Sequence, residues 1–419
     1  MNKKIFGYAL TLIIGIVIIV AAAIWWNFKA GRVSTPPAPP PPPAVVQAPE
    51  NSENGSAPPV ISPPITSPPP ATSPPVTTQQ ASVQPIVTLA RNLEIPWGLD
   101  FLPDGSFGFA QDKSIIFTER PGRVRLIDAN KSLLAEPLLT IDEVAHRGEG
   151  GLLGIAVHPD FARNGFIYVY HTYQAQVGLA NRVVRYRLDG KRLMLNQVIF
   201  DGIPASNIHD GGRLKFGPDG LLYITTGDSS RPDLAQDKNS LAGKILRLKD
   251  DGSIPANNPF PGSPVYSLGH RNPQGLAWDD LGRLWETEHG SSTRDELNLI
   301  QAGRNYGWPV IRGDETAAGM EKPVLHSGDD TWAPSGLAFF EGSLYFTGLR
   351  GQTLYKAVFS GEKVELKRYL VRDFGRLRDV VVGPDKFLYV FTSNRDGRGV
   401  PAAGDDLLIR VDPSQLAGR

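Results

Sequence analysis

The sequence places a histidine and an aspartate where they can act together as a general base. The segment NIHDGGRLKFGPDG puts His209 just before a β-prone run, and the segment TTGDSS puts Asp228 just after the next one. Antiparallel strands joined by a tight turn return the chain to the same end, so we expect these two residues to be neighbours. A carboxylate beside an imidazole fixes the tautomer of the ring and raises its basicity. A single loop histidine is more often structural or solvated, so both roles stay open.

Arginines flank strands of the same kind elsewhere in the chain. GHRNPQGLAW supplies Arg271 and Asn272, GRLRD supplies Arg376 and Arg378, and Arg350 follows another β-prone run. All of these positions fall at one end of the predicted strands. Arginine pairs with carboxylates through two parallel hydrogen bonds, so convergence of the four arginines would favour a multiply anionic ligand. Salt bridges between neighbouring sheets are the alternative role for any one of them.

Oxygen ligands for a cation gather in the segment DELNLIQAGRNYGWP. Asp295 and Glu296 place two carboxylates beside a loop rich in backbone carbonyls, the ligand type that calcium prefers. The chain has no Cys, which excludes a thiolate zinc site and a disulfide framework. The sequence contains no EF-hand spacing, and solvated surface acids are the alternative interpretation.

Short β-strands that recur six times must position these residues. Each unit has a strand, a turn of the Pro-Asp-Gly type, a second strand of alternating aromatic and aliphatic residues, and a third strand. The units begin at Gly98, Gly154, Arg213, Gly275, Gly336 and Asp379. A period of roughly 45 to 60 residues indicates an all-β, six-bladed β-propeller, with a pair of β-sandwiches as the alternative. Helical periodicity is nearly absent, and SFGFAQDKS at 106–114 reads as a surface insertion.

Composition divides the chain into three segments. Residues 1–29 hold Lys3 and Lys4, then an apolar run from Ile5 to Trp26 that is long enough to span a membrane. We interpret 1–29 as an uncleaved transmembrane anchor, with a cleaved signal peptide as the alternative. The lysines before the span predict a cytoplasmic N-terminus and a propeller on the periplasmic or extracellular side.

Residues 30–85 form a Pro-rich linker, and residues 86–415 form the propeller. The linker favours extended polyproline II and acts as a spacer, although a Pro-rich docking ligand is the alternative. The full chain has 43 Lys plus Arg and 43 Asp plus Glu, a net charge of zero. This balance does not resemble a nucleic-acid-binding protein.

Several segments together resemble the soluble quinoprotein glucose dehydrogenase and aldose sugar dehydrogenase family, dependent on pyrroloquinoline quinone (PQQ). They are GEGGLLGIAVHPDF, HDGGRLKFGPDG with TTGD, YSLGHRNPQGLAW, DELNLIQAGRNYGWP and RLRDVVVGPD, spread over nearly all of Pro85 to Pro413. The resemblance implies a propeller that binds PQQ and calcium, oxidises an aldose sugar to a lactone and passes electrons to an external acceptor. It implies that His209 takes the anomeric hydroxyl proton while hydride moves to the quinone, and that Asp228 orients His209.

The same resemblance assigns further roles. It implies cofactor contacts at Arg271, Asn272, Thr331, Arg350, Arg376 and Arg378. It implies a substrate contact at Glu149 and a calcium site at His289, Gly290 and Ser291, with Gly290 acting through its carbonyl. It implies a second, structural calcium site at Asp295, Glu296 and Tyr306.

Some of these positions depart from the soluble glucose dehydrogenase pattern. Glu149 replaces a Gln, His289 and Ser291 stand where Gln and Pro are expected, and Arg350 replaces a Lys. Imidazole is a poor calcium ligand, so His289 puts the side chains of that site in question. These changes favour the aldose branch, with its broader substrate range. A propeller that binds a ligand or protein without turnover, and a calcium-dependent lactonase, are the alternatives.

Overall fold

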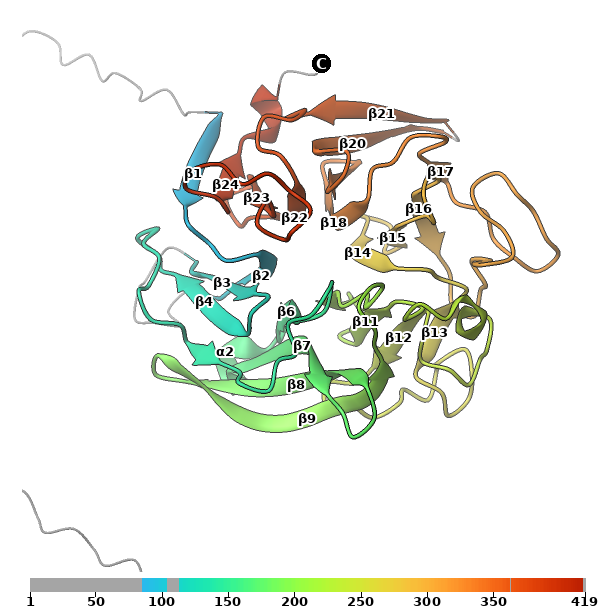
Figure 1. Cartoon of the computed structure of the whole chain (residues 1–419), viewed down its shortest axis with the longest axis horizontal. Coiled ribbons are helices and arrows are strands. Elements are labelled where there is room, and N and C mark those ends of the chain that lie inside the picture. Colours follow the sequence, from blue (N-terminus) through green and yellow to red (C-terminus); the bar gives the residue numbers. More distant parts are fainter. Residues whose placement is uncertain (1–84, 104–112, 362, 417–419) are drawn as a thin grey trace, which may run out of the picture. The chain divides into compact units, whose positions relative to one another are not determined.

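Six four-stranded antiparallel sheets surround a central axis, and each sheet is one blade of a β-propeller (Figure 1). The computed structural model describes residues 85–103, 113–361 and 363–416. The first three blades contain β2 (Pro96–Phe101), β3 (Ile115–Glu119), β4 (Arg123–Ile127), β5 (Leu139–Thr140); β6 (Leu152–Val157), β7 (Phe166–Gln174), β8 (Leu179–Asp189), β9 (Arg192–Pro204); and β10 (Leu214–Phe216), β11 (Leu222–Thr226), β12 (Lys244–Leu248), β13 (Val265–Leu268).

The remaining three blades follow the same order from the axis outward. They contain β14 (Pro273–Trp278), β15 (Leu284–Glu288), β16 (Glu296–Ile300), β17 (Leu325–His326); β18 (Pro334–Phe340), β19 (Ser343–Gly348), β20 (Thr353–Ser360), β21 (Lys363–Tyr369); and β22 (Leu377–Val382), β23 (Leu388–Thr392), β24 (Leu408–Val411), β1 (Ile86–Ala90). The predicted six-bladed propeller is therefore confirmed. Each blade has a fourth, outer strand that the three-strand repeat unit did not include.

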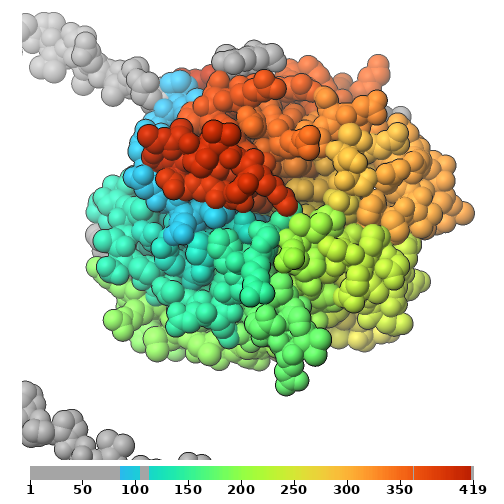
Figure 2. All heavy atoms as spheres, viewed as in Figure 1, coloured from blue at the N-terminus to red at the C-terminus, as the bar shows by residue number. Residues whose placement is uncertain are grey.

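The ring closes through a strand from the start of the propeller. β1 pairs with β24, with Ile86 opposite Val411 and Val87 opposite Arg410, so the first strand of the domain completes the last blade. This pairing joins the two ends of the ring and leaves no open blade at the seam. The space-filling view shows neighbouring blades in contact around the axis, from the blue β1 region to the red sixth blade (Figure 2).

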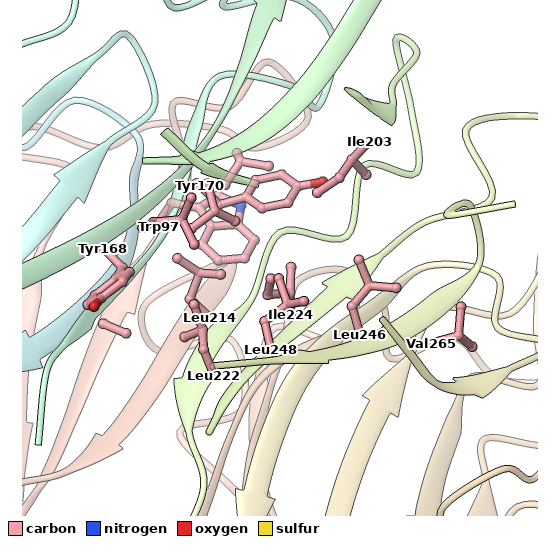
Figure 3. Packing of buried hydrophobic residues seen from close by; sticks show 14 of the residues in the cluster. Trp97, Tyr168, Tyr170, Ile203, Leu214, Leu222, Ile224, Leu246, Leu248 and Val265 are labelled. Carbon is pink, nitrogen blue, oxygen red and sulfur yellow. The ribbon is translucent and has the colours of Figure 1, made fainter. Parts of the chain in front are cut away.

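The hydrophobic core lies between neighbouring blades rather than at one centre. Figure 3 shows one such layer, in which Tyr168 and Tyr170 of blade 2 lie near Leu214 and Ile224 of blade 3. Trp97 belongs to the same cluster and is 2% exposed. Alternate residues of each strand face the neighbouring blade, which explains the aromatic and aliphatic alternation in the sequence. This packing holds the strand ends, and the loops that connect them, in fixed positions.

Helices are few and short, as the sequence predicts. Among the described residues they are α2 (Phe161–Asn164) and two 3-10 turns, η1 (Pro232–Ala235) and η2 (Pro413–Gln415). None of these described helices has the length and apolar character needed to cross a membrane. The predicted anchor at 1–29, nearly all of the linker at 30–85 and most of the insertion at 106–114 lie outside the described residues.

Candidate active site

A cavity of about 300 Å³ opens where loops from blades 2 to 6 meet at one end of the ring. These loops either precede the innermost strand of a blade or follow its second strand. The predicted site residues that line the cavity are Glu149, His209, Arg271, His289, Gly290, Ser291, Asp295, Thr331, Arg350 and Arg376. The ring therefore brings most of the predicted site into one place.

His209 and Asp228 form a hydrogen-bonded pair beside this cavity. His209 Nδ1 lies 2.8 Å from Asp228 Oδ1, which confirms that the two are neighbours. The carboxylate is buried and accepts two further hydrogen bonds, from Ser230 N at 2.8 Å and from Trp308 Nε1 at 2.8 Å. A carboxylate at Nδ1 favours the tautomer with the proton on that nitrogen. Nε2 is then the ring nitrogen that can accept a proton.

The backbone of His209 is held from three directions. Its φ of +64° lies in the left-handed region, which non-glycine residues adopt rarely and only when their surroundings enforce it. The His209 N–H donates to Glu149 Oε2 at 2.9 Å, and its carbonyl accepts from Ser229 N at 3.2 Å. Gly227 packs so closely that a Cβ there would lie 1.9 Å from the His209 carbonyl oxygen. The loop thus fixes where the imidazole points.

Glu149 uses both carboxylate oxygens in contacts with the protein. Oε2 receives the His209 N–H, and Oε1 receives Nη1 of Arg398 at 2.6 Å. Burial by itself raises the pKa of Glu149, but the His209 N–H, the nearby His289 and Arg398 outweigh it and lower the pKa to about 2. Glu149 is therefore ionised at neutral pH. Its predicted role as a substrate contact stays a prediction.

Three of the four predicted arginines converge on the cavity. Arg271 lies with its guanidinium 5.3 Å from the ring centre of Trp308 and donates to the His289 carbonyl at 3.2 Å. Arg376 donates through Nη2 to Asp396 at 2.7 Å, and Arg350 lines the opening. Their positive charges give the cavity the character expected for an anionic ligand.

Arg378 occupies a different place from the other three. It lines a smaller pocket of about 20 Å³ that shares Glu149, His289 and Arg398 with the main cavity. Its Nη1 donates to Gln274 Oε1 at 3.0 Å, and burial lowers its pKa to about 9. Arg378 therefore lies in a pocket that adjoins the main cavity, and its predicted contact with a cofactor stays a prediction. It lies on the innermost strand β22, whereas Arg376 lies in the loop before that strand.

Asn272 and Thr331 are positioned by backbone contacts. Asn272 is buried and its Oδ1 accepts Gly211 N at 3.0 Å, which links blades 3 and 4. Its Nδ2 and the Nε of Arg271 are buried atoms without a hydrogen-bond partner in the described part of the chain. Thr331 Oγ1 donates to the Ser292 carbonyl at 2.9 Å. Donors are thus present for a polar ligand at the Arg271–Asn272 corner.

The predicted calcium loop lines the cavity, but its side chains are already occupied or neutral. Burial lowers the pKa of His289 to about 4, so its imidazole is neutral at physiological pH. Asp295 accepts N–H groups from Gly290 at 2.8 Å, Trp332 at 2.5 Å and Ala333 at 2.8 Å. Asp295 therefore ties two loops together. The ligands that remain for a cation at this loop are backbone carbonyls and hydroxyls around Gly290 and Ser291.

The second predicted cation site includes Tyr306, whose hydroxyl is already used in hydrogen bonds within the protein. The Tyr306 hydroxyl donates to the Leu299 carbonyl at 2.6 Å and accepts Gln301 N at 2.8 Å, so that hydroxyl serves the local fold. Its ring stacks on His270 with centroids 4.9 Å apart. Only the Tyr306 backbone carbonyl is left for a cation.

Glu296 belongs to a buried acidic cluster that the sequence analysis did not identify. His270, Glu286 and Glu288 offer ligand atoms that all lie within 4.8 Å of one another. Asn298 Nδ2 donates to Glu286 at 3.1 Å, to Glu288 at 3.3 Å and more weakly to Glu296 at 3.4 Å. Burial and the neighbouring Glu288 raise the pKa of Glu296 to about 8. Such a cluster holds either protons or a cation.

A family model described as Glucose / Sorbosone dehydrogenase matches residues 93–409, which span the propeller and the site. The chain belongs to the glucose/sorbosone dehydrogenase family. A relative from Escherichia coli named aldose sugar dehydrogenase is 34% identical over 361 residues, covering 78% of this chain and 92% of the relative.

Two solved structures of similar family proteins cover the same part of the chain. The PQQ-bound form of an aldose sugar dehydrogenase from Streptomyces coelicolor is 42% identical, with a TM-score of 0.71, and covers 78% of this chain and 97% of that one. An oxidoreductase from Thermus thermophilus described as a glucose dehydrogenase is 46% identical, with a TM-score of 0.72, and covers 78% and 99%. An oxidoreductase role for this member of the glucose/sorbosone dehydrogenase family is thereby supported.

Two contacts in this dehydrogenase-family site were missed from the sequence. Trp308, which supplies the second hydrogen bond to Asp228, lies 80 positions further along the chain. Arg398, which pairs with Glu149, lies 249 positions away from it. The NYGWP segment that contains Trp308 is part of the resemblance, so its motif was a usable signal. Arg398 lies in an Asp-Gly-Arg turn that carries no local sign of its partner.

Proposed function

We propose that the chain oxidises aldose sugars at the anomeric carbon to lactones, using PQQ and calcium bound in the cavity. The observation that carries this proposal is the His209–Asp228 pair, which lies beside a cavity lined by four arginines, Arg271, Arg350, Arg376 and Arg398. A base next to an anion-binding cavity suits a reaction in which a hydroxyl proton is removed beside an acidic cofactor. The names of the E. coli and S. coelicolor relatives support the same substrate and cofactor classes.

The residues around the cavity fit PQQ, which carries three carboxylates. Arg271, Arg350 and Arg376 line the cavity and supply positive charge. Arg271 Nε and the Nδ2 of Asn272, which follows Arg271 in the chain but does not line the cavity, are buried donors without a partner among the described residues. Burying such donors without a partner is costly, so a bound acceptor would stabilise this corner of the cavity. When bound, the quinone supplies the two-electron oxidant, accepting hydride from the sugar carbon that becomes the lactone carbonyl.

His209 moves the proton in this proposal. Nδ1 is held by Asp228, so Nε2 is free to accept the proton of the anomeric hydroxyl as C–H cleavage proceeds. Asp228 stabilises the imidazolium that results, and the Trp308 and Ser230 hydrogen bonds keep its carboxylate in place. The loop geometry at His209 orients the ring before the sugar arrives. Positioning of this kind contributes substantially to rate.

Two groups of residues fit calcium. Gly290 and Ser291 line the cavity and would hold a calcium ion through their backbone carbonyls, and the neutral His289 beside them would not repel it. The second group is the buried cluster of Glu286, Glu288 and Glu296, where Glu286 Oε1 has no hydrogen-bond partner among the described residues. A cation there would neutralise buried carboxylates and stabilise blade 4.

We also propose a broad aldose specificity and an anchored location. Four positions that depart from the soluble glucose dehydrogenase pattern line the cavity and support the broad specificity: Glu149, His289, Ser291 and Arg350. The apolar run from Ile5 to Trp26, preceded by Lys3 and Lys4, supports a membrane anchor with the propeller outside the cytoplasm. The Pro-rich linker would then hold the propeller near an external electron acceptor.

The decisive experiment uses the full chain in detergent, stripped of metal with EDTA. We expect reduction of an artificial electron acceptor dye only when PQQ, calcium and an aldose are all present, with several aldoses accepted at comparable rates. A strong preference for glucose alone would contradict the broad specificity. Absence of PQQ binding would instead favour a propeller that binds a ligand or protein without redox turnover.

A further inference from the structure

Arg398 makes a contact that crosses the mouth of the cavity. It lies in the loop between β23 and β24 of blade 6, whereas its partner Glu149 precedes β6 of blade 2. These two blades are not neighbours in the ring, because blade 1 lies between them. The Arg398 side chain is 54% exposed and the Glu149 side chain is 18% exposed, so the pair lies at the edge of the cavity.

The loop that carries Arg398 is fixed at its own end by Asp396. Asp396 Oδ1 accepts Arg398 N at 2.9 Å, while Oδ2 accepts Arg376 Nη2 at 2.7 Å. Gly399 follows in a turn so tight that a Cβ there would lie 2.5 Å from the Asn394 carbonyl oxygen. Arg398 therefore approaches Glu149 from a rigid support that also holds one of the cavity arginines.

The other end of the contact reaches the base. Glu149 N donates to the Asn207 carbonyl at 2.8 Å, and Glu149 Oε2 accepts the His209 N–H at 2.9 Å. His209 has the left-handed backbone described above, which needs its surroundings to hold it. The carboxylate of Glu149 is thus held between Arg398 on one oxygen and His209 on the other.

We infer that Arg398 is a positioning residue for His209 and acts through the carboxylate of Glu149. This inference rests on the proposed role of His209 as the base. Without Arg398, the Glu149 carboxylate gains rotational freedom and its hydrogen bond to His209 N–H weakens. The imidazole then loses orientation, while Arg271 and Arg350 keep theirs. The loss falls on turnover and not on substrate binding.

Amide hydrogen exchange of the full chain without added cofactor tests the contact directly. We expect faster exchange in the peptide that contains His209 in Arg398→Gln, and near-normal exchange in Arg398→Lys, which keeps the charge. The matched control is Arg283→Gln, because Arg283 is 50% exposed and pairs with Asp279 at 2.7 Å on the far side of blade 4. The control leaves exchange at His209 unchanged.

Steady-state kinetics with PQQ, calcium and an aldose tests the consequence. In Arg398→Gln we expect kcat to fall about tenfold while KM changes less than about twofold, with partial recovery in Arg398→Lys. The double variant Glu149→Gln/Arg398→Gln should have the same kcat as Glu149→Gln alone, because Arg398 acts on His209 only through Glu149.

Two results would overturn the inference. One is unchanged exchange at His209 in Arg398→Gln. The other is a raised KM with normal kcat, which would make Arg398 a substrate-binding residue instead. If no sugar is oxidised at all, the exchange experiment still decides whether Arg398 positions His209, so failure of the proposed function is distinguishable.

Discussion

Trp308 Nε1 donates a 2.8 Å hydrogen bond to Asp228 Oδ2, while Asp228 Oδ1 faces His209. The indole comes from the long connection between β16 and β17 of blade 4, whereas Asp228 belongs to blade 3. Gly269 O accepts Trp308 N at 2.9 Å, and Gln236 Nε2 donates to the Trp308 carbonyl at 2.6 Å, so the backbone that carries the indole is fixed on both sides. The orientation of the aspartate therefore depends on contacts from two blades.

Trp308→Phe should lower kcat by about tenfold with little effect on KM. Phe keeps an aromatic face for Arg271 but cannot donate to Asp228, so the carboxylate loses one of its fixed contacts. Trp285→Phe is the matched control, because Trp285 Nε1 donates to Asp279 at 2.9 Å away from the site. Steady-state kinetics on both variants checks this. Equal kcat losses in the two would show a general effect on folding instead.

His209→Ala should lower kcat by about a hundredfold or more, because it removes the proposed proton acceptor. Binding of PQQ should change little, since the arginines of the cavity do not depend on the imidazole. His158→Ala serves as the control: His158 also faces a carboxylate, Asp250 at 3.5 Å, but follows β6 at the other end of blade 2. Near-normal turnover in His209→Ala would remove this residue from the mechanism.

Arg271→Gln should weaken PQQ binding by about tenfold to a hundredfold. Its guanidinium lies at the corner where buried donors lack partners, and a charged hydrogen bond to a carboxylate contributes more than a neutral one. Calorimetric titration with PQQ in the presence of calcium measures the affinity. Arg304→Gln is the control, because Arg304 is 55% exposed and pairs with Glu321 at 3.5 Å. Unchanged affinity in Arg271→Gln would place the quinone carboxylates elsewhere.

Asp210→Asn should alter the pH dependence of stability. Burial raises the pKa of Asp210 to about 7, although hydrogen bonds from Asn181 and Ser206 oppose the shift. In the unfolded chain an Asp ionises near pH 4, so the native carboxyl holds its proton longer, and its contribution to stability falls as pH rises from about 4 to about 7. Asn does not titrate and avoids this loss.

Denaturant unfolding of the cofactor-free chain at pH 4 and pH 8 measures the effect. The unfolding free energy of Asp210→Asn relative to the native chain should rise by about 2 to 4 kcal/mol between these pH values. Asp189→Asn, an exposed substitution in the β8–β9 hairpin, should show no such change. A pH-independent difference for Asp210→Asn would contradict the shifted ionisation.

The sequence predicted those parts of the fold that depend on residues close together along the chain. The six repeated strand units form the six blades, and His209 and Asp228 meet because one hairpin carries both. The outer strands β5 and β17 have only two residues each, too few to show an alternating pattern. Strand β1 takes its place only from β24 at the other end of the domain.

In the site, too, the contacts that the sequence missed are those between residues far apart along the chain. Trp308 and Arg398 reach their partners across 80 and 249 positions, so no local spacing reveals the contacts. Glu286 and Glu288 in β15 look like ordinary strand residues in the sequence. They are buried only because other parts of the ring pack over both faces of the strand. The sequence identified the residue types of the site, and the packing of the ring decides which atoms meet.

Gly227→Ala should impair turnover more than stability. A Cβ at Gly227 would lie 1.9 Å from the His209 carbonyl oxygen and 2.3 Å from its carbon, so the loop that carries the base must move. Such overpacking costs about 1 to 3 kcal/mol of stability, and a displaced imidazole loses its alignment with the hydroxyl.

Gly220→Ala is the control, because its φ of +74° makes it strained while nothing lies within 4 Å of the added Cβ. Kinetics and unfolding on both variants separate the two effects: Gly220→Ala loses some stability and keeps kcat, whereas Gly227→Ala loses kcat by about tenfold or more. Normal kcat in Gly227→Ala would show that the position of the His209 loop does not limit turnover.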